Sequence, residues 1–297
     1  LVPVEPATMA GRVVAQWDKD SCEDAGLVKI DLLGLGMLGA ISEAVAQAEF
    51  MGEPTPDLAR LPLDDPEIYA FLRRGDTIGA FQVESRAQQQ MLPRLLPERF
   101  EDIVVQVAIV RPGPIQGGAV HPYLRRRAGL EPVTYLHPVL APVLEETLGV
   151  LLFQEQVLRV AVAAAGFSPG EADLLRRALA RKHSEAAMAA MRKRFLEGAL
   201  PRGLDEATAA AIFGLLEGFA GYGFPKSHAA SFALIAYQSM WLKCYRPVAF
   251  YAALLNLQPM GFYPIEVLAG DARRHGVDLL APDVTRSNAR YTPERME

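Results

Sequence analysis

The sequence has 297 residues, of which 51% are apolar and 22% charged, so it is too apolar for a disordered chain and long enough for about two domains with a sizeable core. Its two cysteines cannot form a disulfide framework and lack the spacing of a zinc site, so we expect a reducing, cytoplasmic location. The net charge of −5 is unevenly spread, because residues 1–70 carry 4 basic and 13 acidic side chains whereas residues 71–194 carry 17 and 12. This distribution suits a phosphate-binding surface beside a metal site, and equally a set of solvated helix faces.

The predicted elements begin with a strand over residues 28–33, where apolar and charged residues alternate before Gly34. The next elements are, in order, a helix over 37–51, a proline-rich loop over 52–65, a short helix from Asp65 to near Arg74 and a short strand over 77–82. Helices separated by glycine and proline are then expected over 84–95, 99–110, 121–128, 138–147, 153–165, 169–182, 184–198, 205–219, 225–243, 246–257 and 263–275. We therefore predict a mainly α fold, in which a helical domain follows a short strand-bearing piece.

Both ends of the sequence lack the features of a complete chain. No Met begins it, no signal-peptide pattern follows, and it stops in a polar stretch, so we expect a fragment of a longer protein. The uncharged run 247–265 is long enough to be considered as a membrane span. Asn256, Pro259 and Pro264 interrupt this run and leave too short a helix, so we expect no membrane association.

Asp31 is the first candidate site residue, because it lies in the apolar stretch 27–34. A carboxylate in such a setting is costly unless it is paired or bound to a metal. One carboxylate does not make a magnesium site, since magnesium requires several oxygen ligands. From its local sequence alone, Asp31 is more simply interpreted as a capping residue or as a salt-bridge partner of Lys29.

Three basic segments could bind phosphate. Arg111 is followed by the sequence Pro-Gly-Pro, which ends a helix and holds the arginine on a rigid corner. A helix opened by Ser168 and Pro169 carries four cations, Arg176, Arg177, Arg181 and Lys182. A third run, Arg125, Arg126 and Arg127, ends another helix. These patterns suit a triphosphate or a nucleic-acid backbone, but surface turns, solvated helix faces and helix C-termini show them too.

The strongest local signal is the segment 221–228, Gly-Tyr-Gly-Phe-Pro-Lys-Ser-His. Two glycines allow the backbone conformations that other residues rarely adopt, and Pro225 fits the first turn of a helix. Lys226, Ser227 and His228 would then lie among the unpaired backbone N–H groups at the positive end of an apolar, buried helix. The segment lacks the spacing of a P-loop, and an ordinary core helix remains the alternative interpretation.

Taken together, these segments resemble the bacterial C-family DNA polymerases, which comprise the alpha subunit of DNA polymerase III and its relatives. The resemblance runs in one collinear order over residues 10–285. It is carried by residues 17–20, 26–35, 81–86, 111–114, 152–156, 175–178 and 219–228. Several long motifs in order are far more specific than any one of them.

The resemblance implies a division of the chain into the C-terminal end of a nucleotidyltransferase-type palm (1–37), a helical fingers domain (38–280) and the start of a following segment (281–297). The family's palm holds three catalytic aspartates that bind two Mg²⁺ ions. Asp31 matches the third aspartate and Lys29 the nearby lysine. The other two aspartates belong to an upstream Asp-x-Asp motif without a counterpart here, so we expect the fragment alone to be inactive.

The resemblance also implies that basic residues of the fingers contact an incoming dNTP. The matching residues are Arg176, Arg177, Lys226 and Ser227, with Arg111, Arg181, Lys182 and His228 as further candidates. The expected reaction is attack of a primer 3′-hydroxyl on the α-phosphate, with release of pyrophosphate. The expected partners are primer–template DNA, dNTP, and other replication or mutasome subunits that bind regions outside this chain.

Two stretches, 121–127 and 255–263, look most like the error-prone, damage-induced paralogue, which implies translesion synthesis in DNA repair. Lys226 departs from that branch, where an acidic residue is expected, so a replicative alpha subunit stays open.

Two alternatives belong to other classes. A non-catalytic nucleic-acid-binding helical module would show no dNTP-dependent tightening on primer–template, and for a helical scaffold that docks proteins the basic clusters would be dispensable.

Overall fold

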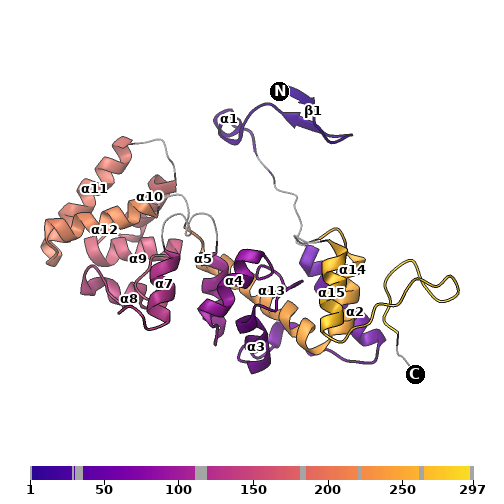
Figure 1. The fold of residues 1–297 in the computed structure, drawn as a ribbon. Coiled ribbons are helices and arrows are strands. Elements are labelled where there is room, and N and C mark those ends of the chain that lie inside the picture. The colour runs from indigo at the N-terminus through magenta and orange to yellow at the C-terminus, as the bar shows by residue number, and fades with distance from the viewer. Residues whose placement is uncertain are drawn as a thin grey trace. The chain divides into compact units, whose positions relative to one another are not determined.

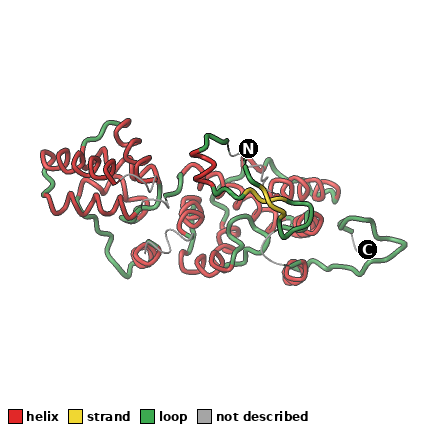
Figure 2. The backbone as a smooth tube through the Cα atoms, turned by 90° about the horizontal axis from the view of Figure 1, so that it is seen from above, coloured by secondary structure: helices red, strands yellow, loops and turns green. Residues whose placement is uncertain are grey.

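The computed structural model describes residues 2–28, 30, 36–110, 119–180, 185–219, 223–260 and 264–294. The chain divides into two compact units, residues 1–36 and 37–297, which we describe separately. Helices make up nearly all of the regular structure, and the only sheet among the described residues is a two-stranded hairpin (Figures 1 and 2). The prediction of a mainly α fold is therefore confirmed.

The first unit contains the hairpin and one short helix. Strand β1 (Val4–Pro6) pairs antiparallel with β2 (Val13–Ala15), and α1 (Lys19–Asp24) follows. The Asp18 side chain caps α1 by accepting a hydrogen bond from the Ser21 amide at 2.8 Å. These elements were not predicted from the sequence, and none of the residues described between 2 and 28 is buried. The strand predicted over 28–33 lies largely outside the described residues, and the described Val28 and Ile30 belong to no strand.

The second unit contains three hydrophobic clusters. The first cluster packs a group of helices against α13 (Lys226–Tyr245), namely α3 (Pro66–Arg74), α4 (Arg86–Leu95), α5 (Phe100–Ile109) and α7 (Val120–Arg127). Local signals fix these helices: Asp65 caps α3, Gly75 ends it with φ = 68°, and Ser85 caps α4. The ring of Tyr69 and other apolar side chains of the cluster are buried, so tertiary packing holds α13 rigidly.

The second cluster gathers the helices between α7 and α13 in the sequence (Figure 1). They are the 3₁₀ turn η2 (Pro138–Leu140), α8 (Ala141–Leu144), α9 (Gln154–Ala165), α10 (Pro169–Ala180), α11 (Glu185–Ala199) and α12 (Glu206–Gly218). Two further 3₁₀ turns, η3 (Glu145–Thr147) and η4 (Leu200–Arg202), lie in the connections after α8 and α11. Rings of Phe167, Phe195 and Phe213 meet at centroid distances of 5.9 and 5.4 Å in its core. The single helix predicted over 138–147 is thus three short pieces.

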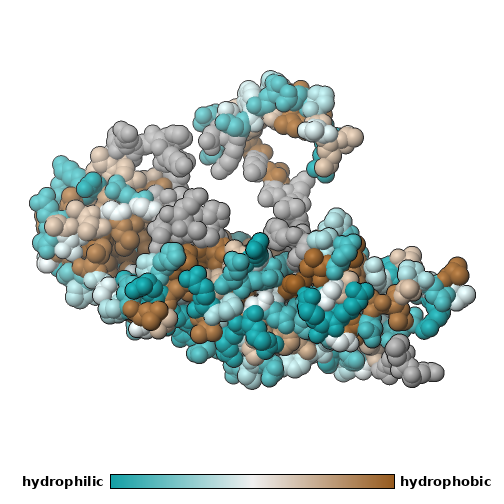
Figure 3. Space-filling view, viewed as in Figure 1, coloured by the Kyte–Doolittle hydropathy of each residue, from teal (hydrophilic) through white to brown (hydrophobic). Residues whose placement is uncertain are grey.

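The third cluster packs α2 (Gly36–Phe50) against α14 (Pro247–Asn256), α15 (Ile265–Arg274) and the last turns of α13. A 3₁₀ turn, η1 (Leu58–Arg60), lies in the loop between α2 and α3. On the face shown in Figure 3, hydrophilic and hydrophobic residues are interspersed over the second unit. Among the described helices, none combines the length and the apolar character that a membrane crossing requires.

The strand predicted over 77–82 is wrong, because these residues form turns. Gly79 has φ = 81°, and a Cβ atom there would lie 2.5 Å from a methyl carbon of Leu254. The buried Thr77 hydroxyl closes the turn by donating to the Val83 carbonyl at 2.6 Å. The left-handed glycine and the local hydrogen bond therefore fold this short apolar run into a turn, whereas a strand would need a neighbouring strand to pair with.

Candidate functional site

The starts of α9 and α13 are joined by backbone pairing. Phe153 and Phe224 form a parallel bridge, in which the Gln154 amide donates to the Phe224 carbonyl at 3.0 Å. The Gln154 side chain donates to the Gly223 carbonyl at 2.9 Å. Gly223 permits this approach, because a Cβ atom there would lie 2.8 Å from Cγ of Gln154. Each helix starts within two residues of the bridge, so the positive ends of two helix dipoles lie together.

Two carboxylates converge on Lys226, the first residue of α13. Its backbone N–H points at both carboxylate oxygens of Glu155, at 3.1 and 3.0 Å. Its ammonium pairs with the carboxylate of Glu146 on η3 and lies 5.8 Å from the centre of the Phe153 ring. The Lys226 and Glu146 side chains are 43% and 35% exposed. The junction therefore binds negative charge, supplied here by the protein itself.

Ser227 and His228 lie at the exposed start of the same helix. The His228 ring lies between the rings of Phe224 and Phe232, at centroid distances of 5.1 and 4.1 Å. The Ser227 carbonyl accepts a hydrogen bond from the Ser231 hydroxyl at 3.0 Å. The helix predicted over 225–243 is α13, which runs from Lys226 to Tyr245, so Pro225 is the capping residue before the helix and does not lie in its first turn. The binding roles of Lys226, Ser227 and His228 stay predictions.

Arg176 and Arg177 share one carboxylate on α10. Arg176 donates twice to one oxygen of Asp173, at 3.0 and 2.8 Å, and Arg177 contacts the other oxygen at 2.8 Å. The hydrogen bond from Arg176, with the charge of Arg177, lowers the pKa of Asp173 below its usual value. In the part of the chain that the structure describes, no hydrogen bond or ion pair joins either arginine to Lys226.

Arg127 is bound within the protein. Its guanidinium donates to both oxygens of the buried Asp102 carboxylate at 2.7 Å, and to the carbonyls of Leu95 and Leu96 at 2.5 and 3.0 Å. This arrangement anchors the end of α7 to α4 and α5. A bidentate ion pair of this kind stabilises the fold. The basic run in the sequence did not indicate this structural role for Arg127.

The two neighbouring arginines differ in exposure. Arg126 is 12% exposed and donates to the Leu148 carbonyl at 2.7 Å and to Thr134 at 3.2 Å. Arg125 is 59% exposed and contacts only Glu131, at 3.3 Å, among the described side chains. Of the three arginines predicted to bind DNA, Arg125 is therefore the most accessible to an external backbone. That role stays a prediction for all three.

Five other predicted site residues lie outside the described residues. They are Lys29, Asp31, Arg111, Arg181 and Lys182. Their proposed contacts with metal and triphosphate stay predictions.

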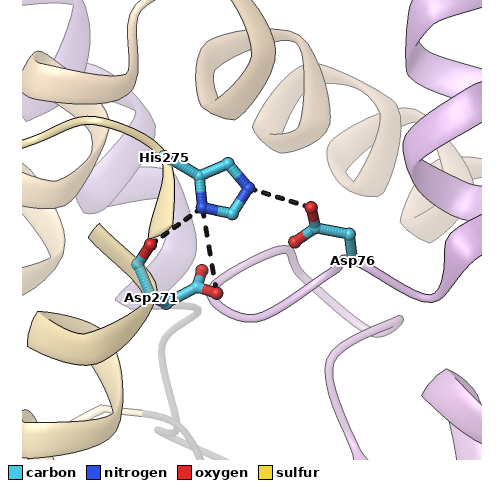
Figure 4. Close-up of side chains that lie close together, drawn as sticks. All are labelled: Asp76, Asp271 and His275. Atoms are coloured by element: carbon cyan, nitrogen blue, oxygen red, sulfur yellow. Dashed lines mark hydrogen bonds and ion pairs between the residues drawn. The ribbon is translucent and has the colours of Figure 1, made fainter. Parts of the chain in front are cut away.

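A buried polar network that the sequence patterns did not indicate joins α13, α14, α15 and the loop after α3. Nε2 of His275 lies 2.9 Å from the Asp76 carboxylate, and Nδ1 lies 2.8 Å from the Asp271 carbonyl (Figure 4). The buried Lys243 ammonium donates to Asp76 at 3.0 Å and to Asp271 at 2.8 Å. The Tyr251 hydroxyl donates to Asp271 at 2.6 Å.

This network has the residue types of a metal site, but Lys243 already supplies its cation. Burial opposes the charged form of Asp271, yet the Lys243 ammonium and the hydrogen bonds around it lower its pKa. Burial and the hydrogen bond to Asp271 raise the pKa of Tyr251. The carboxylates are therefore satisfied by the protein, and the network does not fit a magnesium centre. The sequence signal that could have indicated this network is Lys243, a single charged residue in the stretch 239–245.

Comparisons with known proteins agree with the resemblance. Residues 37–203 match the family described as "Bacterial DNA polymerase III alpha subunit finger domain", and residues 1–34 match "Bacterial DNA polymerase III alpha NTPase domain". A protein of Anaeromyxobacter dehalogenans named "Error-prone DNA polymerase" is 56% identical over 292 residues, which cover 95% of this chain and 26% of the relative.

Two further relatives carry the same name. The protein of Methylococcus capsulatus is 55% identical over 297 residues, which cover 100% of this chain and 28% of the relative. The protein of Teredinibacter turnerae is 54% identical over 289 residues, which cover 97% of this chain and 28% of the relative. The chain therefore spans little more than a quarter of the length of these relatives.

Proposed function

Because the chain belongs to the bacterial DNA polymerase III alpha subunit family, we propose that it is part of a DNA-directed DNA polymerase that adds dNTPs to a primer 3′-end. We assign it to the error-prone branch, which acts in translesion synthesis. The observation that carries this assignment is identity of 54–56% with three relatives named error-prone DNA polymerase, over 95–100% of the chain.

Residues 1–37 are proposed as the end of the palm and residues 38–280 as the fingers, with residues 281–297 starting the next segment. The division into compact units at residue 36 supports this proposal, as does the change of family match between residues 34 and 37. The N-terminal unit buries none of its described residues, as expected for a piece completed by other parts of a palm.

In this proposal, the fingers residues bind the triphosphate of the dNTP. Lys226 combines a partly exposed ammonium with the positive start of α13, and both attract phosphate oxygens. Arg176 and Arg177 would add charge from α10 and neutralise the negative charge that develops as pyrophosphate leaves. Ser227, His228, Arg111, Arg181 and Lys182 are further proposed contacts.

Mg²⁺ is the proposed metal, with Asp31 as a ligand beside Lys29. Bound Mg²⁺ would activate the primer hydroxyl and stabilise the leaving oxygens. The cluster of Asp76, Asp271 and His275 does not supply this site, since both of its carboxylates are paired with Lys243. The metal is therefore assigned to Asp31 and to carboxylates from elsewhere in the polymerase.

Primer–template DNA is the proposed macromolecular partner, with Arg125 as the accessible backbone contact on α7. A reducing, cytoplasmic location is proposed from the two free cysteines. Burial raises the pKa of the Cys244 thiol to about 12, which keeps it unreactive. Other replication or mutasome subunits are proposed to bind regions outside this chain.

The test is primer extension by the full-length polymerase on an undamaged template and on one with an abasic site. The proposal predicts dNTP-dependent extension on both templates, with frequent misincorporation. Failure of the full-length protein to extend any primer would contradict the polymerase assignment. Accurate extension that stops at the lesion would instead favour the replicative branch.

A further inference from the structure

We propose that Glu146 is an internal counter-ion of Lys226, which the triphosphate displaces, so that Glu146 sets the affinity for dNTP. This inference rests on the proposed function, because it assumes that Lys226 binds phosphate. It adds a residue that neither the sequence motifs nor the family resemblance pointed to. Glu146 and Lys226 are 80 residues apart in the sequence.

Glu146 is held in position by a rigid turn. Its neighbour Thr147 is buried, donates to the Val150 carbonyl at 2.5 Å and accepts from the Gln156 side chain at 2.8 Å. Leu148 ends the turn with φ = 53°. Because the backbone of η3 is fixed, the Glu146 carboxylate stays within reach of the Lys226 ammonium, and the remaining cost of the ion pair is the ordering of the two side chains.

The two carboxylates at Lys226 bind different groups. Glu155 accepts the backbone N–H with both oxygens and lies in the first turn of α9, where its charge is itself favourable. Among the described residues, the Glu146 carboxylate contacts only the ammonium of Lys226. Rotation of the Glu146 side chain therefore frees the ammonium without disturbing the start of α13.

Partial exposure makes this exchange accessible to a nucleotide. A phosphate that reaches the 43% exposed Lys226 side chain brings negative charge close to Glu146, and the two anions repel each other. The triphosphate must then displace Glu146 from the Lys226 ammonium before it can bind there. This exchange of one charge-assisted contact for another lowers the net free energy gained on dNTP binding. Removing the Glu146 charge abolishes this competition, so dNTP should bind more tightly.

The experiment uses the full-length polymerase and measures the apparent Kd for each dNTP in single-turnover primer extension. Glu146→Gln keeps the size of the side chain and removes its charge. We expect a twofold to fivefold lower Kd, about the range covered by an exposed ion pair. Glu145→Gln is the matched control, since Glu145 lies on the same turn and has no ion pair among the described residues. It should leave the Kd unchanged.

Lys226→Gln separates this inference from the proposed function. If Glu146 acts through Lys226, Glu146→Gln should have no effect in the Lys226→Gln background. An unchanged or higher Kd for Glu146→Gln, with a clearly higher Kd for Lys226→Gln, would overturn the counter-ion role and leave the triphosphate role intact. An unchanged Kd for Lys226→Gln would contradict both. Thermal melting of each variant excludes a folding defect as the cause.

Discussion

Lys243 offers the sharpest test of how the fold is held together. Lys243→Met keeps the aliphatic stem but removes an ammonium that donates to Asp76, to Asp271 and to the Ile78 carbonyl, at 2.8–3.1 Å. Asp271 is 2% exposed and would keep only Tyr251 and Arg274 as side-chain hydrogen-bond donors. Breaking a buried pair costs about 3–5 kcal/mol, and these remaining donors favour the lower end, about 3 kcal/mol.

The measurement is urea unfolding of the chain, followed by the fluorescence of Trp241, which lies two residues from Lys243 on α13. A Trp17→Phe background leaves Trp241 as the only tryptophan. Lys193→Met is the matched control, because Lys193 is 78% exposed and its ion pair with Glu197 spans 3.9 Å. Its effect should stay within about 0.5 kcal/mol. A loss below about 1 kcal/mol for Lys243→Met would show that the Lys243 ammonium is not needed to compensate the buried Asp271 charge.

The same network predicts a dependence of stability on pH. Lys243 and the neighbouring hydrogen bonds lower the pKa of buried Asp271 below its unfolded value of about 3.9. A carboxylate with a lowered pKa contributes stability above the unfolded value and loses it as the pH falls through the folded value. The advantage of the wild type over Asp271→Asn should therefore be complete at pH 7 and shrink below about pH 4. A constant difference from pH 7 to pH 3 would contradict this assignment.

Four further predictions concern the polymerase reaction and the arginines of α7. Asp31→Asn in the full-length enzyme should lower the extension rate by orders of magnitude with little change in DNA affinity, as measured by single-turnover kinetics and DNA titration. The 297-residue chain alone should not extend primers, and any template-directed extension would contradict the need for further metal ligands. Arg127→Ala should lower the free energy of unfolding by about 3 kcal/mol, because it leaves the buried Asp102 carboxylate with only two backbone amides and the Arg99 side chain at 3.7 Å among the described residues. Arg125→Ala should change the free energy of unfolding by less than about 0.5 kcal/mol and should weaken the salt dependence of DNA binding. Equal unfolding midpoints for the two arginine variants would contradict these assignments.

The helices were predictable because their ends carry local signals. Asp65 and Pro66 start α3, Gly75 ends it, and Pro225 precedes α13, each within a few residues of the boundary concerned. In place of the single helix predicted over 138–147, the structure has the short helix α8 with a 3₁₀ turn on either side. Local propensity does not decide between one helix and three short turns when tertiary contacts fix each piece.

The contacts around the site could not be predicted, because their partners are distant in the sequence. Lys243 meets Asp76 across 167 residues, and Lys226 meets Glu155 across 71. Arg127, which a basic run marks as a DNA contact, is bound by Asp102 across 25 residues. A one-dimensional pattern identifies the charge but does not show which opposite charge the fold brings to it.

The most direct test of the central claim compares dNTP use and DNA affinity in one variant of the full-length enzyme, Lys226→Ala. The apparent Kd should rise about tenfold when the charge-assisted phosphate contact is lost, and it should rise for all four dNTPs, because phosphate carries no base identity. Primer–template affinity should change much less. An unchanged dNTP dependence combined with weaker, less salt-dependent DNA binding would contradict the account and assign Lys226 to the DNA backbone.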